Sequence, residues 1–166
     1  MNIKLTFSAA VALTVLASAC LGVSYTITDI GSFTPGGMNN NGQVIGSLYE
    51  DILVWDSING LRDIGGLMPG GGGKPFDIND SGQVTGRSWV MWTVALSLPH
   101  AFRWSVDEGM VDIGTLSGDN MATGFAIDQS GRVYGVSATW YAGIRKVFEW
   151  SEDGGMIALA LPQYAY

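Results

Sequence analysis

Hydrophobic and polar residues follow one another in short runs along this chain, and after the apolar N-terminal stretch they keep no helical period over a dozen residues. Two segments, Ala101–Trp104 and Val147–Trp150, alternate with a period of two, which is typical of strands whose two faces differ. The 24 glycines and the scarcity of Ala-, Leu-, Glu- and Lys-rich stretches argue against helices. The pattern therefore predicts an all-β fold.

The predicted strands belong to a module that occurs three times. The middle copy runs from Phe76 to Gly86, then through His100–Ser105 to Leu116. Repetition of this length marks a repeat architecture. The chain divides into a lead-in with a strand at 20–37, repeat 1 at 38–67, a Gly-rich linker at 68–75, repeat 2 at 76–116, a linker at 117–124, and repeat 3 with the C-terminal tail at 125–166.

Each module has, between its first and second predicted strands, a turn that has Asn or Asp first and Gly last, at Asn39–Gly42, Asn79–Gly82 and Asp128–Gly131. The side chain of such a first residue can bond the backbone ahead of it, and Gly accepts the positive φ that closes a tight hairpin. A second glycine follows four residues later in every copy, at positions 46, 86 and 135. We expect the strand to bulge there or the backbones to approach closely.

Four strands in about 40–50 residues is the size of one β-propeller blade. The leading segment Tyr25–Gly31 matches the fourth strand of a module, so the chain is expected to begin with an outer strand and then give three units. A closed propeller has about four to eight blades. The prediction is therefore a partial β-propeller-like fold with three four-stranded antiparallel units, whose open sheet edges invite self-association; a β-trefoil is the alternative.

The repeats resemble a known family, the bacterial extracellular HAF repeats. The resemblance rests on Ile78–Gly86, His100–Ser105 and Gly109–Leu116, and it extends more weakly over residues 25–160. The tripeptide His100-Ala101-Phe102 is replaced by Asp51-Ile52-Leu53 in the first module and by Lys146-Val147-Phe148 in the third. The resemblance implies a secreted, propeller-like protein and brings no catalytic residues. A truncated fragment of a longer HAF-repeat propeller is a further alternative.

The first 19 residues have the order of a secretory signal peptide: a basic Lys4, an apolar run over Leu5–Leu16 and a small-residue cleavage site at Ala17–Ala19. The only cysteine, Cys20, follows directly and leaves no partner for an intramolecular disulfide. Because Leu16–Cys20 resembles a bacterial lipobox, Cys20 is a candidate lipidation site. We expect an exported protein, extracellular, periplasmic or anchored in the outer membrane by lipid; an uncleaved membrane anchor is the alternative.

Charge and composition exclude several function classes. The chain has 15 acidic and 8 basic residues, for a net charge of −7, and it lacks the basic surface that nucleic-acid binding requires. The single histidine, His100, has no His or Cys partner for a zinc site. The Asx-rich turns lack the spacing of a calcium loop, and Gly70–Lys74 lacks the Ser or Thr of a phosphate loop. We predict no metal and no cofactor.

The residues outside the repeat pattern are the candidate ligand-binding residues. Trp89, Trp92, Trp140 and Tyr141 lie between the second and third strands of their modules. Loops at one rim of a repeat scaffold commonly carry binding, and exposed aromatic rings there would stack on a glycan or anchor an envelope protein. The alternative is that these side chains pack over the edge of the domain or extend the strands.

The recurring Trp55, Trp104 and Trp150 are expected in the core. With no catalytic cluster in view, the sequence favours a non-enzymatic, exported binding scaffold for a glycan or a protein. The alternative is an extracellular hydrolase or lyase that uses carboxylates such as Asp63 and Asp112.

Overall fold

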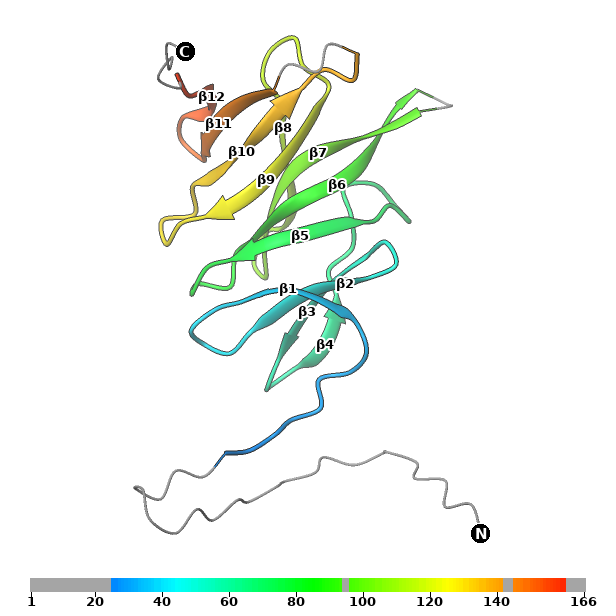
Figure 1. The fold of residues 1–166 in the computed structure, drawn as a ribbon, viewed down its shortest axis with the longest axis vertical. Coiled ribbons are helices and arrows are strands. Elements are labelled where there is room, and N and C mark those ends of the chain that lie inside the picture. Colours follow the sequence, from blue (N-terminus) through cyan, green and yellow to red (C-terminus); the bar gives the residue numbers. More distant parts are fainter. Residues whose placement is uncertain (1–24, 94–95, 142–144, 161–166) are drawn as a thin grey trace, which may run out of the picture. The chain divides into compact units, whose positions relative to one another are not determined.

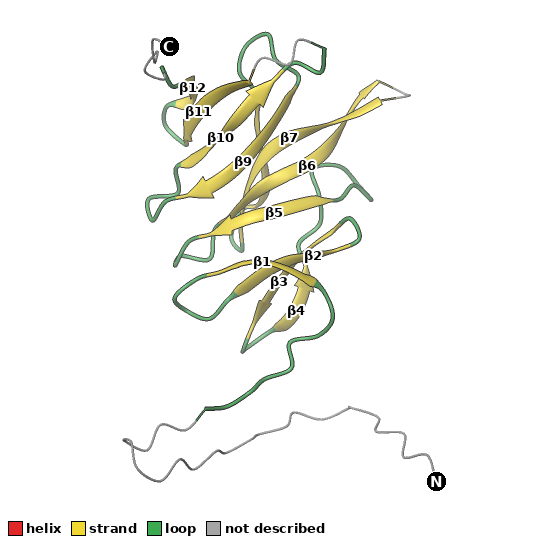
Figure 2. Cartoon of the chain, viewed as in Figure 1, coloured by secondary structure: helices red, strands yellow, loops and turns green. Residues whose placement is uncertain are grey.

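The structure, a computed structural model, describes residues 25–93, 96–141 and 145–160. The chain divides into two compact units, Met1–Gly31 and Ser32–Tyr166. The described residues of the first unit, Tyr25–Gly31, have no regular secondary structure. All the strands of the described residues lie in the second unit, and these residues contain no helix (Figure 2).

The second unit holds three four-stranded antiparallel sheets. Sheet 1 consists of β1 (Thr34–Met38), β2 (Val44–Leu48), β3 (Asp51–Asp56) and β4 (Gly60–Asp63). Sheet 2 consists of β5 (Gly73–Ile78), β6 (Val84–Thr93), β7 (Leu96–Ser105) and β8 (Gly109–Gly114). Sheet 3 consists of β9 (Met121–Ile127), β10 (Val133–Ala138), β11 (Arg145–Ser151) and β12 (Gly155–Ala158). The predicted all-β fold with three four-stranded units is confirmed.

Within each sheet the strands pair in sequence order, so every sheet is a simple meander (Figure 1). The strand pairing stays inside each sheet in the described residues. This arrangement is that of propeller blades, because a trefoil closes its barrel through strand pairs between units. The first strands of the sheets, β1, β5 and β9, follow one another in contact along one side of the assembly.

Two details of the predicted organisation need correction. Tyr25–Gly31 forms no strand, although its sequence matches the fourth strand of a module. An extra outer strand needs an incomplete sheet to pair with, and each of the three sheets already has its own fourth strand. Both segments predicted as linkers also end earlier than expected, since Gly73, Lys74 and Pro75 belong to β5 and residues 121–124 of the second linker belong to β9.

Hydrophobic side chains fill the two interfaces between neighbouring sheets. The interface between sheets 1 and 2 contains Ile45, Ile52, Val54, Ile78, Val84, Phe102 and Trp104. The interface between sheets 2 and 3 contains Ala101, Ile113, Leu116, Ala122, Ile127, Val133, Phe148 and Trp150. Trp104 and Trp150 are buried, as predicted. Burial of large apolar and aromatic side chains is the main stabilising contribution to such a stack.

One buried cation also crosses the second interface. The guanidinium of Arg103 lies 5.1 Å from the ring centre of Trp150 and pairs with Glu108 and Glu152. Arg103 belongs to sheet 2, whereas Trp150 and Glu152 belong to sheet 3 and its last turn. The cation–π contact and the Arg103–Glu152 ion pair therefore hold the two sheets together, whereas the Arg103–Glu108 pair lies within sheet 2. At the equivalent position of sheet 1, the first interface has the apolar Val54.

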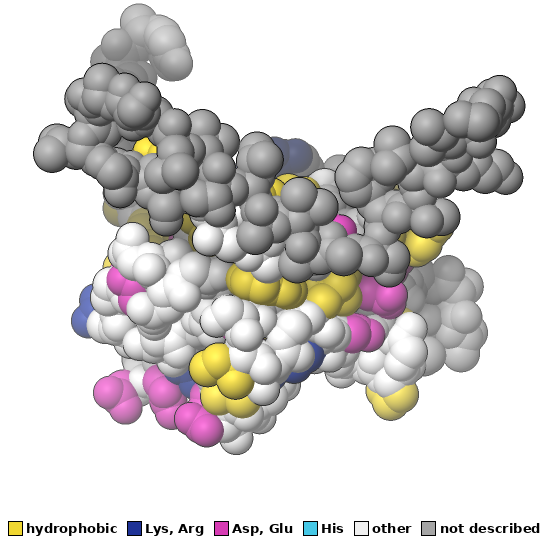
Figure 3. All heavy atoms as spheres, turned by 90° about the horizontal axis from the view of Figure 1, so that it is seen from below, with side chains coloured by type: hydrophobic (Ala, Val, Ile, Leu, Met, Phe, Trp, Pro, Cys, Tyr) yellow, Lys and Arg dark blue, Asp and Glu magenta, His cyan; other side chains and the backbone are white. Residues whose placement is uncertain are grey.

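The equivalent outward face of sheet 1 has no sheet packed on it within the described residues. Trp55 is only half-buried there, and Met38 and Leu61, which share this face in the register, are 71% and 40% exposed. Figure 3 views the molecule from the end of sheet 1 and shows hydrophobic side chains beside acidic ones on the surface. Trp55 thus occupies the same position as Trp104 and Trp150 but lacks the neighbour that buries them.

The recurring glycines lie where the first strand of each sheet bulges. The register shifts in β1, β5 and β9 occur opposite Gly46, Gly86 and the Tyr134/Gly135 step. A Cβ at Gly86 would lie 2.2 Å from the carbonyl oxygen of Lys74 and 2.8 Å from the ring of Phe102. A Cβ at Gly135 would meet Thr123 and Phe148 in the same way. The expected close approach is confirmed.

The three Asx-Gly turns have a common hydrogen-bond pattern, and we call them together the turn stack (Asn39–Gln43, Asn79–Gln83 and Asp128–Arg132). In each turn, the backbone amide of the first residue donates to the carbonyl oxygen of the fifth residue. The backbone amide of the glycine donates to the carbonyl oxygen of the first residue. The first side chain accepts the amide of the fifth residue at 2.9–3.0 Å. The turn glycines have φ of 74°, 77° and 83°, as expected from the sequence.

The turn stack also joins the three sheets. The side-chain amide of Asn39 donates to the carbonyl of Asn79 at 2.8 Å, and that of Asn79 donates to the carbonyl of Asp128 at 2.9 Å. Asn79 is only 2% exposed. Its side chain therefore closes its own hairpin and fixes the next sheet, and the turns lie in succession along one side of the sheets (Figure 1).

Asp80 adds a second connection between the first two turns. Its carboxylate accepts the backbone amide and the side-chain amide of Asn40, both at 2.9 Å. These hydrogen bonds lower the pKa of Asp80 below its ordinary value of 3.8. In the third turn, burial opposes ionisation of Asp128, but hydrogen bonds from Ser130 and Arg132 and the charge of Arg132 outweigh it and lower that pKa as well.

Substituting Gly86 with Ala should reduce the free energy of unfolding by about 2–3 kcal/mol, because the new methyl group overlaps backbone that cannot move aside cheaply. Urea unfolding measures this loss. Gly37→Ala is the matched control in β1: its Cβ would meet Ile45 at 3.5 Å and the carbonyl oxygen of Phe76 at 3.9 Å, both ordinary contacts, so a change within about 0.5 kcal/mol is expected. Equal losses in the two variants would contradict the packing described for Gly86.

Acid should weaken the turn stack. A carboxylate whose folded pKa lies below its unfolded value stabilises the fold fully above the unfolded value, and this contribution is lost as pH falls through the folded pKa. For Asp80 the loss is therefore expected as pH falls below 3.8. Asp80→Asn should be less stable than the wild type at pH 7 and should lose less stability on acidification. Parallel pH–stability curves for the two proteins, measured by thermal unfolding, would contradict this role for Asp80.

Candidate functional site

The β2–β3 and β10–β11 connections, between the second and third strands of sheets 1 and 3, carry exposed aromatic side chains, and we call these two connections the hairpin rim. They lie at the opposite end of the strands from the turn stack (Figure 1). In sheet 1 the rim residue is Tyr49, which is 92% exposed and has a positive φ of 55°. Tyr49 was not among the residues singled out from the sequence, because the first module has no insertion there.

Trp89 lies on β6, so the apolar insertion of the second module lengthens a hairpin and does not form a loop. Its ring is half-buried, and its indole nitrogen donates to Glu50 Oε2 at 2.8 Å, across to the sheet 1 rim. The alternative prediction, that the apolar insertion extends the second and third strands, is therefore confirmed: β6 runs to Thr93 and β7 begins at Leu96. Trp92 also belongs to β6, but its side chain lies outside what the structure describes.

Trp140 and Tyr141 lie in the connection between β10 and β11, the equivalent hairpin of sheet 3. Trp140 is 56% exposed and Tyr141 is 81% exposed. The backbone amide of Trp140 donates to Asn120 Oδ1 at 2.9 Å, which fixes the start of this connection against the loop before β9. Of the predicted aromatic residues, Trp140 and Tyr141 thus lie in the hairpin rim and Trp89 lies on β6, and Tyr49 adds the first sheet to the rim.

The carboxylates considered for catalysis have a structural role. Asp29, Asp63 and Asp112 each accept the backbone amide of the glycine two residues ahead, at 2.9, 2.9 and 2.8 Å. The glycine has a positive φ in each case. This Asx turn ends the fourth strand of sheets 1 and 2, and it explains why Asp recurs at this position.

His100 lies on β7 beside Asp112, with its Nδ1 3.0 Å from Asp112 Oδ2. Both side chains are partly exposed. No hydroxyl or thiol of the described residues hydrogen-bonds to His100, so within this part of the chain no nucleophile is paired with it. The His100–Asp112 pair is a surface contact that joins the neighbouring strands β7 and β8.

Other site predictions concern the N-terminal part of the chain and metal binding. Cys20 and the segment predicted as a signal peptide lie outside the described residues. Within the described residues, no helix is long and apolar enough to cross a membrane. No group of three or more His, Cys, Asp or Glu side chains among them could hold a metal ion.

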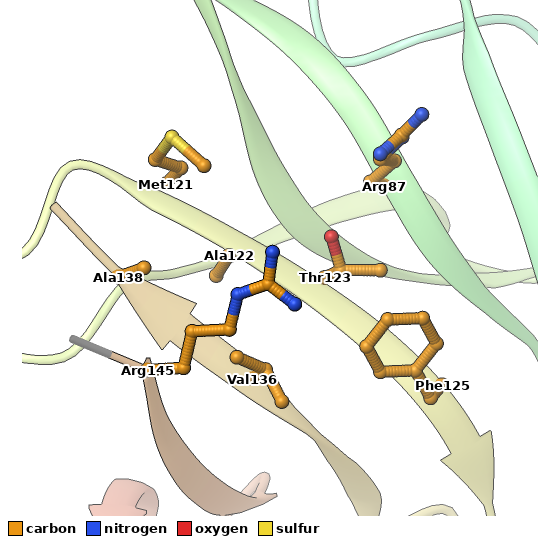
Figure 4. Close-up of a pocket in the computed structure, with 8 residues that line it drawn as sticks. All are labelled: Arg87, Met121, Ala122, Thr123, Phe125, Val136, Ala138 and Arg145. Carbon is orange, nitrogen blue, oxygen red and sulfur yellow. The ribbon is translucent and has the colours of Figure 1, made fainter. Parts of the chain in front are cut away.

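A pocket that the sequence did not reveal lies where sheets 2 and 3 meet. It has a volume of about 190 Å³ and is lined by Arg87, Met121, Thr123, Phe125, Val136 and Arg145, together with two alanines (Figure 4). Arg87 comes from β6, the next residues come from β9 and β10, and Arg145 begins β11. In Figure 4 the side chain of Arg145 extends from β11 over the neighbouring strands on the side of Thr123.

No family model matches this chain, and comparisons with curated proteins and with solved structures also find no match.

Proposed function

We propose that the chain is an exported, non-enzymatic module that binds an extracellular glycan through its hairpin rim. The observation that carries this proposal is the recurrence of exposed aromatic rings at equivalent hairpins, in Tyr49, Trp140 and Tyr141. Exposed aromatic side chains in a group commonly mark interaction sites, since they expose apolar area to water when free. Their flat rings match the apolar faces of sugar rings.

The scaffold supports this proposal in two ways. The rim residues lie on hairpins of packed sheets, so the backbone positions that carry the rings are set by the repeat scaffold. Asp63 and Asp112 are engaged in Asx turns, which leaves the hydrolase or lyase alternative without a free carboxylate pair in the described residues. The proposal includes secretion by the signal peptide, membership of the HAF-repeat family, and lipidation of Cys20 as an anchor to the envelope.

Substituting both Trp140 and Tyr141 with Ala should weaken glycan binding at least tenfold, which corresponds to about 1.4 kcal/mol. Calorimetry against a panel of soluble polysaccharides measures the change. A double substitution of Ile58 and Val106 with Ala removes hydrophobic side chains of similar exposure from the turns between third and fourth strands, and it should leave binding unchanged.

Two results would overturn the proposal. Unchanged affinity of the Trp140/Tyr141 double variant would remove the rim as the binding surface. Absence of binding to every polysaccharide, combined with rim-dependent retention of an envelope protein, would show that the ligand is a protein.

A further inference from the structure

Three basic side chains of this acidic protein have no acidic partner among the described residues. Four other cations are ion-paired: Arg62 with Asp56, Arg103 with Glu108 and Glu152, Arg132 with Glu149, and Lys146 with Asp119. Lys74, Arg87 and Arg145 have no carboxylate oxygen within 4.0 Å in the described part of the chain. With 15 acidic residues against 8 basic ones, unpaired cations are not explained by a shortage of carboxylates.

The three unpaired cations occur in one region of the fold. Arg87 and Arg145 line the same pocket, from sheets 2 and 3 respectively (Figure 4). Lys74 is the direct cross-strand partner of Arg87 in the β5–β6 ladder. Like charges directly opposite one another in an antiparallel pair are destabilising. The folded protein therefore concentrates positive charge at this place at a cost to its stability.

Aromatic rings accompany these cations. The ammonium of Lys74 lies 5.8 Å from the ring centre of Phe76, and the guanidinium of Arg87 lies 5.9 Å from that of Trp89. Phe76 meets Phe125 edge to face, with ring centres 5.1 Å apart, which links sheet 2 to sheet 3. Phe125 is 50% exposed and lines the pocket. Phe76 and Phe125 are the residues at the bulges of β5 and β9, and the bulges therefore place these two rings beside the cations.

We propose that this basic pocket, formed by Arg87, Thr123, Phe125 and Arg145 with Lys74 at its edge, binds the carboxylate of an acidic sugar residue in the glycan. This assignment rests on the proposed glycan-binding function and names the chemical class of its ligand. A guanidinium pairs with a carboxylate through two parallel hydrogen bonds and is more weakly hydrated than an ammonium. The exposed face of Phe125 suits the apolar face of the sugar ring, and Thr123 can bond a sugar hydroxyl.

The size and the surroundings of the pocket agree with a single sugar residue of a longer chain. Its volume of about 190 Å³ is below the roughly 300–1,000 Å³ of pockets that enclose whole drug-sized ligands. Trp89 joins the pocket to the hairpin rim through its contact with Arg87, and Arg145 stands at the end of the connection that carries Trp140.

The test is calorimetry of the purified protein at low salt with oligogalacturonate and with its methyl ester, which keeps the sugar ring and removes the charge. The wild type should bind the acid form at least tenfold more tightly than the ester. Substituting both Arg87 and Arg145 with Gln should weaken binding of the acid form at least tenfold. Arg132→Gln removes an exposed cation elsewhere, and it is the control that should bind like the wild type.

A thermal unfolding scan separates binding from folding. Neither arginine makes an ion pair in the described residues, and losing the repulsion between Arg87 and Lys74 offsets losing the Arg87–Trp89 cation–π contact, so the double variant should unfold at about the wild-type temperature. A fall in unfolding temperature that accompanies the loss of binding would overturn the assignment, since the arginines would then act through the fold.

The outcomes distinguish this inference from the proposed function. Equal binding of acid form and ester, lost in the Trp140/Tyr141 variant but kept in the arginine variant, would overturn the carboxylate site and leave glycan binding in place. Failure of both compounds and of neutral polysaccharides to bind would overturn both proposals. Displacement of oligogalacturonate by inorganic phosphate at an equal concentration would show a general anion site and would contradict recognition of a sugar carboxylate.

Discussion

The hydrogen bond from the Asn79 side chain to the Asp128 carbonyl, with its counterpart from Asn39 to Asn79, is the constraint on which the arrangement of the three sheets depends. Hydrophobic contact between sheets is strong but not directional. A buried amide that must satisfy its hydrogen bonds is directional, and leaving it unsatisfied costs about 1–3 kcal/mol. Apolar side chains therefore hold the sheets together, and the turn stack fixes their order and alignment.

This alignment has consequences at the far end of the strands. Fixing the hairpin turns at one end also fixes how the strands of neighbouring sheets lie beside one another, and so it positions the rim residues Tyr49 and Trp140 and the β6 residue Trp89. It also brings β6 beside β9, where Arg87 joins Thr123 and Phe125 around one pocket. The scaffold residues thus follow the repeat, whereas the exposed aromatic and unpaired basic residues depart from it.

Much of the scaffold was predictable because the sequence pattern within a single module determines it. The Asx-Gly turns, the close approach at Gly86 and the burial of Trp104 each follow from chemistry within one module. The structure departs from the expectation at Tyr25–Gly31, because a strand-like sequence forms a strand only where a sheet edge is free to pair with it. The pocket was not predictable, since its residues come from four strands of two sheets, β6, β9, β10 and β11, and its signal, a cation without an acidic partner among the described residues, exists only in three dimensions.

The most direct test compares urea unfolding of Asn79→Ala with that of Asp128→Ala. Both side chains close their own turn, but only Asn79 also bonds the next sheet. If the side chains of the turn stack hold the sheets in order, Asn79→Ala should lose about 2–3 kcal/mol of unfolding free energy and Asp128→Ala about 1 kcal/mol. Equal losses in the two variants would contradict the central role of the bond between the turns.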